Sequence, residues 1–128
     1  EGVPGWGASG EISFVAQLGD LIDGVNKAAG ASESALRTVL SELHKAPTQK
    51  FIHLIGNHEL YNFSRQDITR FLAPNPPGGA LPLDSAYYAF SPHPQWNIVV
   101  LDPFDISTLA PSNGDVEEAY RMLALNNP

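Results

Sequence analysis

The sequence contains no cysteine, and this absence excludes several kinds of structure and chemistry. A disulfide framework, a zinc site built on cysteine and a thiol nucleophile all need a residue that the chain does not have. Basic residues are also scarce, because 7 Lys and Arg stand against 14 Asp and Glu, for a net charge of −7. Non-specific binding to nucleic acid or to an anionic membrane surface needs a basic face, so we expect neither.

Long apolar runs are missing as well. No stretch approaches the roughly 20 apolar residues that a membrane-spanning helix requires. Residues 1–10, "EGVPGWGASG", lack the basic and apolar regions of a signal peptide, and their Gly and Pro content predicts a tail or a loop. We therefore expect a cytoplasmic protein. A length of 128 residues suits one domain with a modest core, so we expect a single domain over residues 1–128.

Two short apolar runs enclose a helical pattern in the first half of the chain. Residues 12–18, "ISFVAQL", and residues 50–55, "KFIHLI", each end at a glycine and predict buried strands. Residues 31–46 carry apolar side chains at helical spacing, with Ser32 or Ser34 as the expected N-cap. A strand, a helix and a strand in this order predict a right-handed βαβ unit with parallel strands.

The second half of the chain predicts smaller elements. Residues 67–73 indicate a short helix, and residues 75–84 indicate a loop rich in Pro and Gly. Residues 86–92 and 97–102 predict the two strands of an antiparallel hairpin, and residues 114–125 predict a final helix. The expected fold class is therefore α/β, with a βαβ unit followed by a β-hairpin and a terminal helix.

The two predicted parallel strands end in the same way. "FVAQLGD" and "FIHLIGN" are each an apolar strand, a glycine and an oxygen-bearing side chain. Parallel strands end at one edge of a sheet, so Asp20 and Asn57 should emerge side by side where open α/β sheets bind ligands. A carboxylate and an amide oxygen suit a hard cation such as Mn²⁺, Mg²⁺ or Fe²⁺.

A second acidic residue and a histidine lie close to this pair in the sequence. Asp23 follows Asp20 by three residues, and His58 directly follows Asn57. A carboxylate near an imidazole can hold its tautomer and raise its basicity, and the imidazolium can then protonate a leaving oxygen. The residues also allow plainer interpretations, in which Asp20 caps a helix, Asn57 occupies a left-handed turn and His58 lies on a surface turn.

"GDLID" followed downstream by "GNHE" resembles the central pair of motifs of the calcineurin-like metallophosphoesterases. The resemblance implies part of an α/β sandwich with a two-metal phosphoesterase site, in which Asp20 would bridge the metals and Asn57 would bind one of them. His58 would contact the substrate phosphate or protonate the leaving group, oriented by Asp23. Glu59 completes the motif without an assigned catalytic role. Manganese is the expected metal, with magnesium, iron or zinc as alternatives.

A longer part of the chain resembles one branch of that superfamily. "FVAQLGDLIDGVN" and "YYAFSP…NIVVLDPFDIS" look like the manganese-dependent ADP-ribose/CDP-alcohol diphosphatases, over most of residues 12–108. That resemblance implies metal-dependent hydrolysis of a phosphoanhydride or phosphodiester in a nucleotide-type small molecule.

Other motifs of the superfamily are missing from the sequence. An Asp-x-His motif does not precede Gly19, and Gly-His and Gly-His-x-His motifs do not follow residue 59. The remaining histidines do not replace them, because we expect His44 in the helix, His53 inside a strand and His93 in the hairpin turn. The chain is therefore expected to hold only the middle of the site, as a fragment, a truncated homologue or a degenerate copy.

The missing motifs leave the function of this chain open between two classes. The chain is either the central piece of a hydrolase or a catalytically silent module that binds a nucleotide or a protein, and in either case the metal pair can be absent. A sheet edge left open by missing strands would favour self-association.

Overall fold

The computed structural model describes residues 12–48, 50–72, 86–109 and 115–127 of the chain. In chain order its elements are β1 (Val15–Gln17), α1 (Val25–Ala28), α2 (Ser32–Leu43), β2 (Phe51–His53), α3 (Asn57–Asn62), α4 (Arg65–Leu72), β3 (Tyr88–His93), β4 (Trp96–Val100) and α5 (Asp115–Asn126). The tail predicted for residues 1–10 and the loop predicted for residues 75–84 lie outside the described residues. No helix in the described part of the chain has the length and apolar character needed to cross a membrane.

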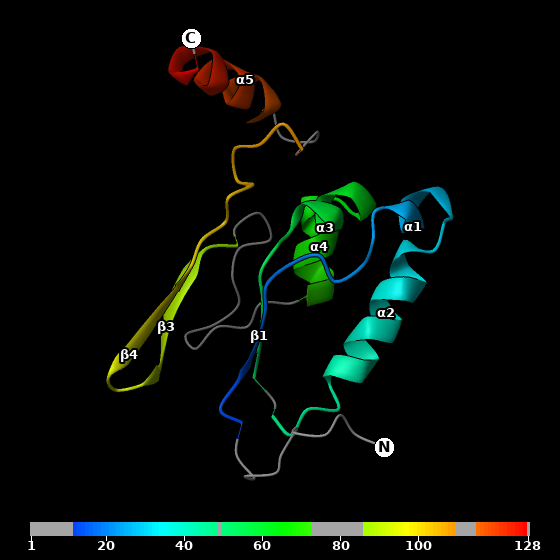
Figure 1. Cartoon of the computed structure of the whole chain (residues 1–128), viewed down its shortest axis with the longest axis vertical. Coiled ribbons are helices and arrows are strands. Elements are labelled where there is room, and N and C mark those ends of the chain that lie inside the picture. Colours follow the sequence, from blue (N-terminus) through cyan, green and yellow to red (C-terminus); the bar gives the residue numbers. More distant parts are fainter. Residues whose placement is uncertain (1–11, 49, 73–85, 110–114, 128) are drawn as a thin grey trace.

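Strands β1 and β2 pair in parallel, as the sequence predicts. Their register sets Val15 opposite Phe51 and Gln17 opposite His53. Both strands therefore end at the same edge of the sheet, and Figure 1 shows the chain continuing from them toward α1 and α3. The loops that follow the two strands meet there.

Helix α2 confirms the predicted helix, but its predicted N-cap is wrong. The helix begins at Ser32, and the N-cap position is Ala31, which makes no side-chain hydrogen bond. The Ser34 hydroxyl donates to the carbonyl of Ala31 at 3.0 Å. The Ser32 hydroxyl instead donates to the amide oxygen of Asn62 at 2.7 Å. This serine therefore joins α2 to the end of α3 and does not cap its own helix.

The buried core lies between α2, α4 and the loop after β1. Its buried members are Ile22, Leu36, Ile68 and Leu72, and Leu36 and Ile68 keep no more than 2% of their surface exposed. Because Ile22 lies only two residues after Asp20, burial of this isoleucine anchors the loop that leaves β1.

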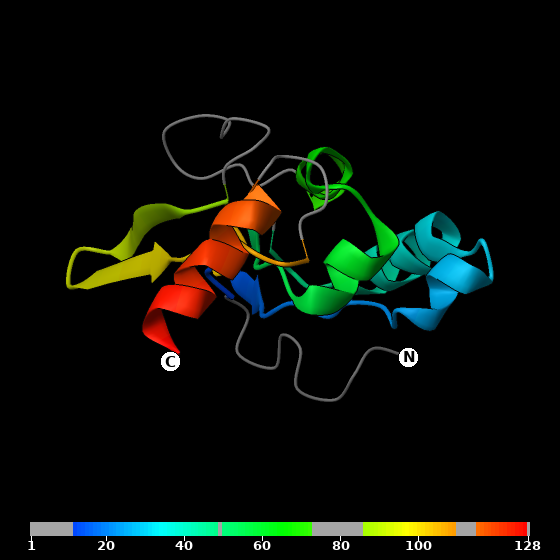
Figure 2. The same ribbon diagram turned by 90° about the horizontal axis from the view of Figure 1, so that it is seen from above.

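Strands β3 and β4 form the predicted antiparallel hairpin. The register pairs Tyr88 with Val100 and His93 with Trp96, with an irregularity between Phe90 and His93. The hairpin stands on one side of the β1–β2 pair, and helices α1 to α4 stand on the other (Figures 1 and 2).

Two short helices, α1 and α3, are not predicted by the sequence, whereas α4 and α5 are. Helix α4 begins at Arg65, two residues before its predicted start. Helix α3 begins at Asn57, directly inside the "GNHE" motif, where only a turn is predicted. The side chains of this motif are therefore presented from the first turn of a helix.

Candidate active site

Two glycines bring the loops after β1 and β2 into backbone contact. Gly19 has φ of 98°, and a Cβ added there would lie 2.7 Å from the backbone nitrogen of Gly56. A Cβ added to Gly56 would lie 2.1 Å from Oδ1 of Asp20. Only glycine fits at either position, so the close approach of the two loops depends on both.

Asp20 has an unusual backbone conformation at this junction. Its φ is 57°, in the left-handed region that a residue with a side chain enters at a cost of roughly 1–2 kcal/mol. Oδ1 of Asp20 accepts a hydrogen bond from the backbone N–H of His58 at 3.0 Å. The carboxylate is thus held over the start of α3 while the residue stays exposed to solvent. Strain of this kind is often found at functional sites.

Glu59 fixes both loops from below the surface. Its side chain is buried, with 1% exposure, and its two carboxylate oxygens accept three backbone N–H groups. Oε2 accepts from Asp20 and from Gly56, both at 2.8 Å, and Oε1 accepts from Leu21 at 2.7 Å. Hydrogen bonds to an ionised acceptor are stronger than neutral ones, so this single carboxylate ties the two motifs together.

The positioning role of Glu59 is not predicted by the sequence. The sequence did carry a signal for one of these hydrogen bonds. In a capping box, an acidic residue three positions after the helix N-cap accepts a hydrogen bond from the N-cap backbone N–H. The bond from Gly56 to Glu59 is that half of the box. The bonds to the other loop depend on tertiary structure.

The orientation of the His58 ring is set by a backbone group. Nδ1 of His58 accepts a hydrogen bond from the N–H of Gly24 at 3.2 Å. The proton of the neutral ring therefore lies on Nε2, which is left as a donor. The ring also packs against Tyr61, with centroids 5.4 Å apart. This geometry can direct one N–H toward a phosphate oxygen or a leaving oxygen.

Asp23 holds the turn that presents Gly24 to this ring. Its Oδ1 accepts the backbone N–H of Val25 at 2.8 Å, and its carbonyl accepts from the side-chain amide of Asn62 at 3.1 Å. Among the described residues, the hydrogen bond to the imidazole of His58 comes from Gly24 and not from the Asp23 carboxylate. Asp23 is therefore linked to the His58 ring through the backbone of Gly24, and its orienting effect stays a prediction.

Asn62 is a second residue whose contribution the sequence does not predict. It is buried, and its side-chain nitrogen donates to the carbonyls of Asp23 and of His58, the latter at 2.8 Å. Its side-chain oxygen accepts from Ser32. The end of α3 is thereby joined both to the loop that follows β1 and to α2.

The exposed carboxylate of Asp20 and the half-buried Asn57 are the residues that could hold a metal ion here. Their oxygen atoms fit Mn²⁺ or Mg²⁺ in chemical type. Within the described ranges, no group of three or more His, Asp or Glu side chains is arranged to hold a metal ion. The two residues therefore fit part of a metal site, and additional ligands are required to complete it.

Comparison with known proteins finds relatives that are similar to most of this chain. No family model matches the chain. The manganese-dependent ADP-ribose/CDP-alcohol diphosphatase of Danio rerio is 39% identical over 105 residues, which cover 77% of this chain and 32% of the relative. The human protein of that name is 35% identical over 89% of this chain and 36% of its own length, and the Arabidopsis thaliana one is 33% identical over 96% and 38%.

A solved structure shows the same relationship. The crystal structure of a dimetal phosphatase from Danio rerio matches with a TM-score of 0.72 and 32% identity. The match covers 91% of this chain and 38% of the solved chain.

The fold described above is therefore part of a dimetal phosphatase fold, as the sequence predicts. The more specific resemblance, to the manganese-dependent ADP-ribose/CDP-alcohol diphosphatases, is also confirmed. The chain spans 32–38% of the length of these relatives.

Proposed function

We propose that this chain is the central part of a metal-dependent diphosphatase, forming an incomplete single domain over residues 1–128. The complete protein would hydrolyse a phosphoanhydride or phosphodiester in a nucleotide-type small molecule such as ADP-ribose or a CDP-alcohol, in the cytoplasm. The observation that supports this most directly is the junction of the two loops, where Asp20 lies over the start of the helix that carries Asn57 and His58. The names of the relatives support the substrate class.

In this proposal the oxygens of Asp20 and Asn57 hold divalent metal, with manganese first and magnesium, iron or zinc as alternatives. Bound metal would supply positive charge and Lewis acidity beside the phosphate. His58 would donate a hydrogen bond from Nε2–H to a phosphoryl oxygen or to the negative charge that develops on the leaving oxygen. Asp23 would keep that donor in place through Gly24.

The other metal ligands would come from polypeptide other than the two motifs. Self-association through a sheet edge is one way to supply them. Among the described residues, β1 pairs only with β2 and β3 pairs only with β4, so each of these sheets has two unpaired edges. Unpaired edges offer N–H and C=O groups to another strand.

A catalytically silent binding module is the second candidate. It is favoured by one observation, which is that the described residues bring together only part of a metal site. Such a module would bind a nucleotide equally well with and without divalent metal, whereas the hydrolase would depend on it.

Hydrolysis of ADP-ribose by this chain with Mn²⁺ tests the proposal. We expect Asp20→Ala and His58→Ala each to lower turnover by about 10²-fold or more, since the first removes a metal ligand and the second removes a donor to the phosphate. His44→Ala is the matched control, because His44 is exposed at the end of α2. Undiminished manganese-dependent turnover in Asp20→Ala would refute the role of Asp20. A folded but inactive chain that binds nucleotide without metal would favour the silent module.

A further inference from the structure

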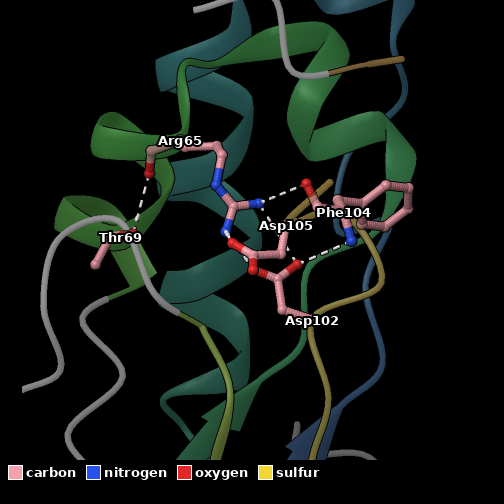
Figure 3. A network of polar contacts seen from close by, with 5 residues as sticks. All are labelled: Arg65, Thr69, Asp102, Phe104 and Asp105. Carbon is pink, nitrogen blue, oxygen red and sulfur yellow. Dashed lines mark hydrogen bonds and ion pairs between the residues drawn. The ribbon is translucent and has the colours of Figure 1, made fainter. Parts of the chain in front are cut away.

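A buried ion pair joins the start of α4 to the segment that follows β4 (Figure 3). Arg65 is 4% exposed, and its guanidinium pairs with the carboxylate of Asp102, whose side chain is fully buried. Nη1 of Arg65 also donates to the carbonyl of Phe104 at 3.1 Å. Asp102 in turn accepts the backbone N–H of Phe104 at 3.0 Å. The arginine therefore fixes both a side chain and the backbone of the segment.

The charges around Arg65 show that its guanidinium is already satisfied. A buried arginine near a phosphate site is an obvious candidate for a phosphate ligand, because its planar fork matches two oxygens. Here Asp102 occupies that fork, and the carboxylate of Asp105 lies 3.9 Å from Nη2. The three groups together carry a net charge of −1, which would repel a phosphate.

The segment that Arg65 contacts, residues 102–109, lies at the end of the molecule where β1 and β2 finish. The chain leaves β4 toward the same end at which β1 and β2 finish and α3 begins (Figure 1). Arg65 is three residues beyond Asn62, the last residue of α3, and its contacts with Asp102 and with the carbonyl of Phe104 hold the start of residues 102–109 beside α4. Asp105 is 55% exposed at its side chain and Ile106 is 45% exposed, so the segment presents both polar and apolar surface.

We propose that Arg65 is a positioning residue that holds residues 102–109 as a second wall of the substrate site. This wall would contact the nucleoside part of the substrate and not its phosphates, because Asp105 repels phosphate while Ile106 offers apolar surface. The inference rests on the proposed function, and it adds a specificity element that contacts neither the metal nor the reacting phosphate.

Arg65→Lys tests the proposal, because lysine keeps the charge but cannot span both Asp102 and the carbonyl of Phe104. We expect KM for ADP-ribose to rise about tenfold while kcat stays nearly unchanged. A tenfold change corresponds to the loss of one hydrogen bond to a charged group. Hydrolysis of bis(p-nitrophenyl) phosphate, which has no nucleoside, should stay the same. Arg37→Lys is the matched control, since Arg37 makes an exposed ion pair with Glu33 on α2. An unchanged KM, or equal losses on both substrates, overturns the proposal.

Amide hydrogen exchange tests whether Arg65 positions the segment, and it does not require the chain to be enzymatically active. In the unmodified chain the amide of Phe104 should exchange more slowly than that of Asp105, and Arg65→Lys should speed exchange at Phe104 about tenfold. Unchanged exchange at Phe104 in a folded variant overturns the proposal, and so does equal exchange at the two amides in the unmodified chain. If the chain hydrolyses neither substrate and binds nucleotide equally well without metal, the proposed function fails, while exchange would still show whether Arg65 holds the segment.

Discussion

At the scale of single residues, the site depends on how closely two backbones can approach. Gly19 and Gly56 leave no room for a side chain, and Asp20 takes up a left-handed conformation between them. The sequence allowed the glycines to be predicted as turn residues, because each ends an apolar strand. It did not predict the left-handed φ of Asp20.

Gly19→Ala separates the cost of crowding from the cost of a positive φ. Gly30 also has a positive φ, of 63°, but an added Cβ there would meet nothing within 4 Å. We expect Gly30→Ala to destabilise the chain by about 1 kcal/mol, from φ alone. Gly19→Ala should cost roughly 2 kcal/mol more, since its Cβ would clash with the backbone of Gly56. Urea unfolding measures both, and equal losses of stability would contradict the crowding described here.

His53 makes the stability of the fold depend on pH. Burial of its imidazole, with the nearby His44 as a smaller cause, lowers the pKa of His53 from 6.5 to about 4. The unfolded chain therefore binds a proton at this residue before the folded chain does, so stability is full above pH 6.5 and falls as the pH drops toward 4. We expect a loss of roughly 1–3 kcal/mol across that window.

Urea unfolding at pH 7 and pH 4.5 checks this dependence. His53→Leu should flatten the pH profile of the unfolding free energy between these values, whereas His93→Leu, at an exposed position, should leave it unchanged. An identical slope in the original chain and in His53→Leu would show that another group is responsible.

At the scale of elements, the sequence predicts the helices and strands that have a clear pattern of apolar residues. β1, β2, the hairpin, α2, α4 and α5 follow from apolar runs and spacing, and the parallel pairing follows from chain order. The short helices α1 and α3 have too few residues for a periodic pattern. Contacts from elsewhere in the chain hold them: Asp20 and Leu21 donate to Glu59 of α3, and Lys27 of α1 donates to the carbonyl of Asn62.

Glu59→Gln tests how α3 is attached to the loop after β1. The glutamine amide offers two donors where three backbone donors already converge, so at least one N–H loses its acceptor. We expect the variant to be destabilised by about 2–3 kcal/mol. A buried backbone N–H would be left without an acceptor, and the remaining bonds would lose their charged acceptor. Thermal unfolding measures the effect, and Glu33→Gln, in an exposed pair on α2, should change stability by less than about 0.5 kcal/mol. A similar small effect for Glu59→Gln would mean that α3 is held by other contacts.

At the scale of the whole molecule, the sequence predicts that the loops after β1 and β2 meet, but it does not predict the contacts that support them. "GDLID" and "GNHE" identify Asp20, Asn57 and His58, because each motif ends a strand and parallel strands share an edge. The ion pair of Arg65 with Asp102 joins residues 37 positions apart, and no local pattern indicates it. Such long-range contacts depend on how the hairpin packs beside the βαβ unit.

The central claim is that the loops after β1 and β2 together form part of a metal site. Paramagnetic broadening of the amide resonances by substoichiometric Mn²⁺ tests it most directly, because broadening reports even weak binding at an incomplete site. We predict selective loss of signal at residues 19–24 and 56–59, and recovery of those signals in Asp20→Asn. The control variant Asp67→Asn, on α4, should broaden like the original chain. Broadening that is absent from these loops, or that persists unchanged in Asp20→Asn, would contradict the account.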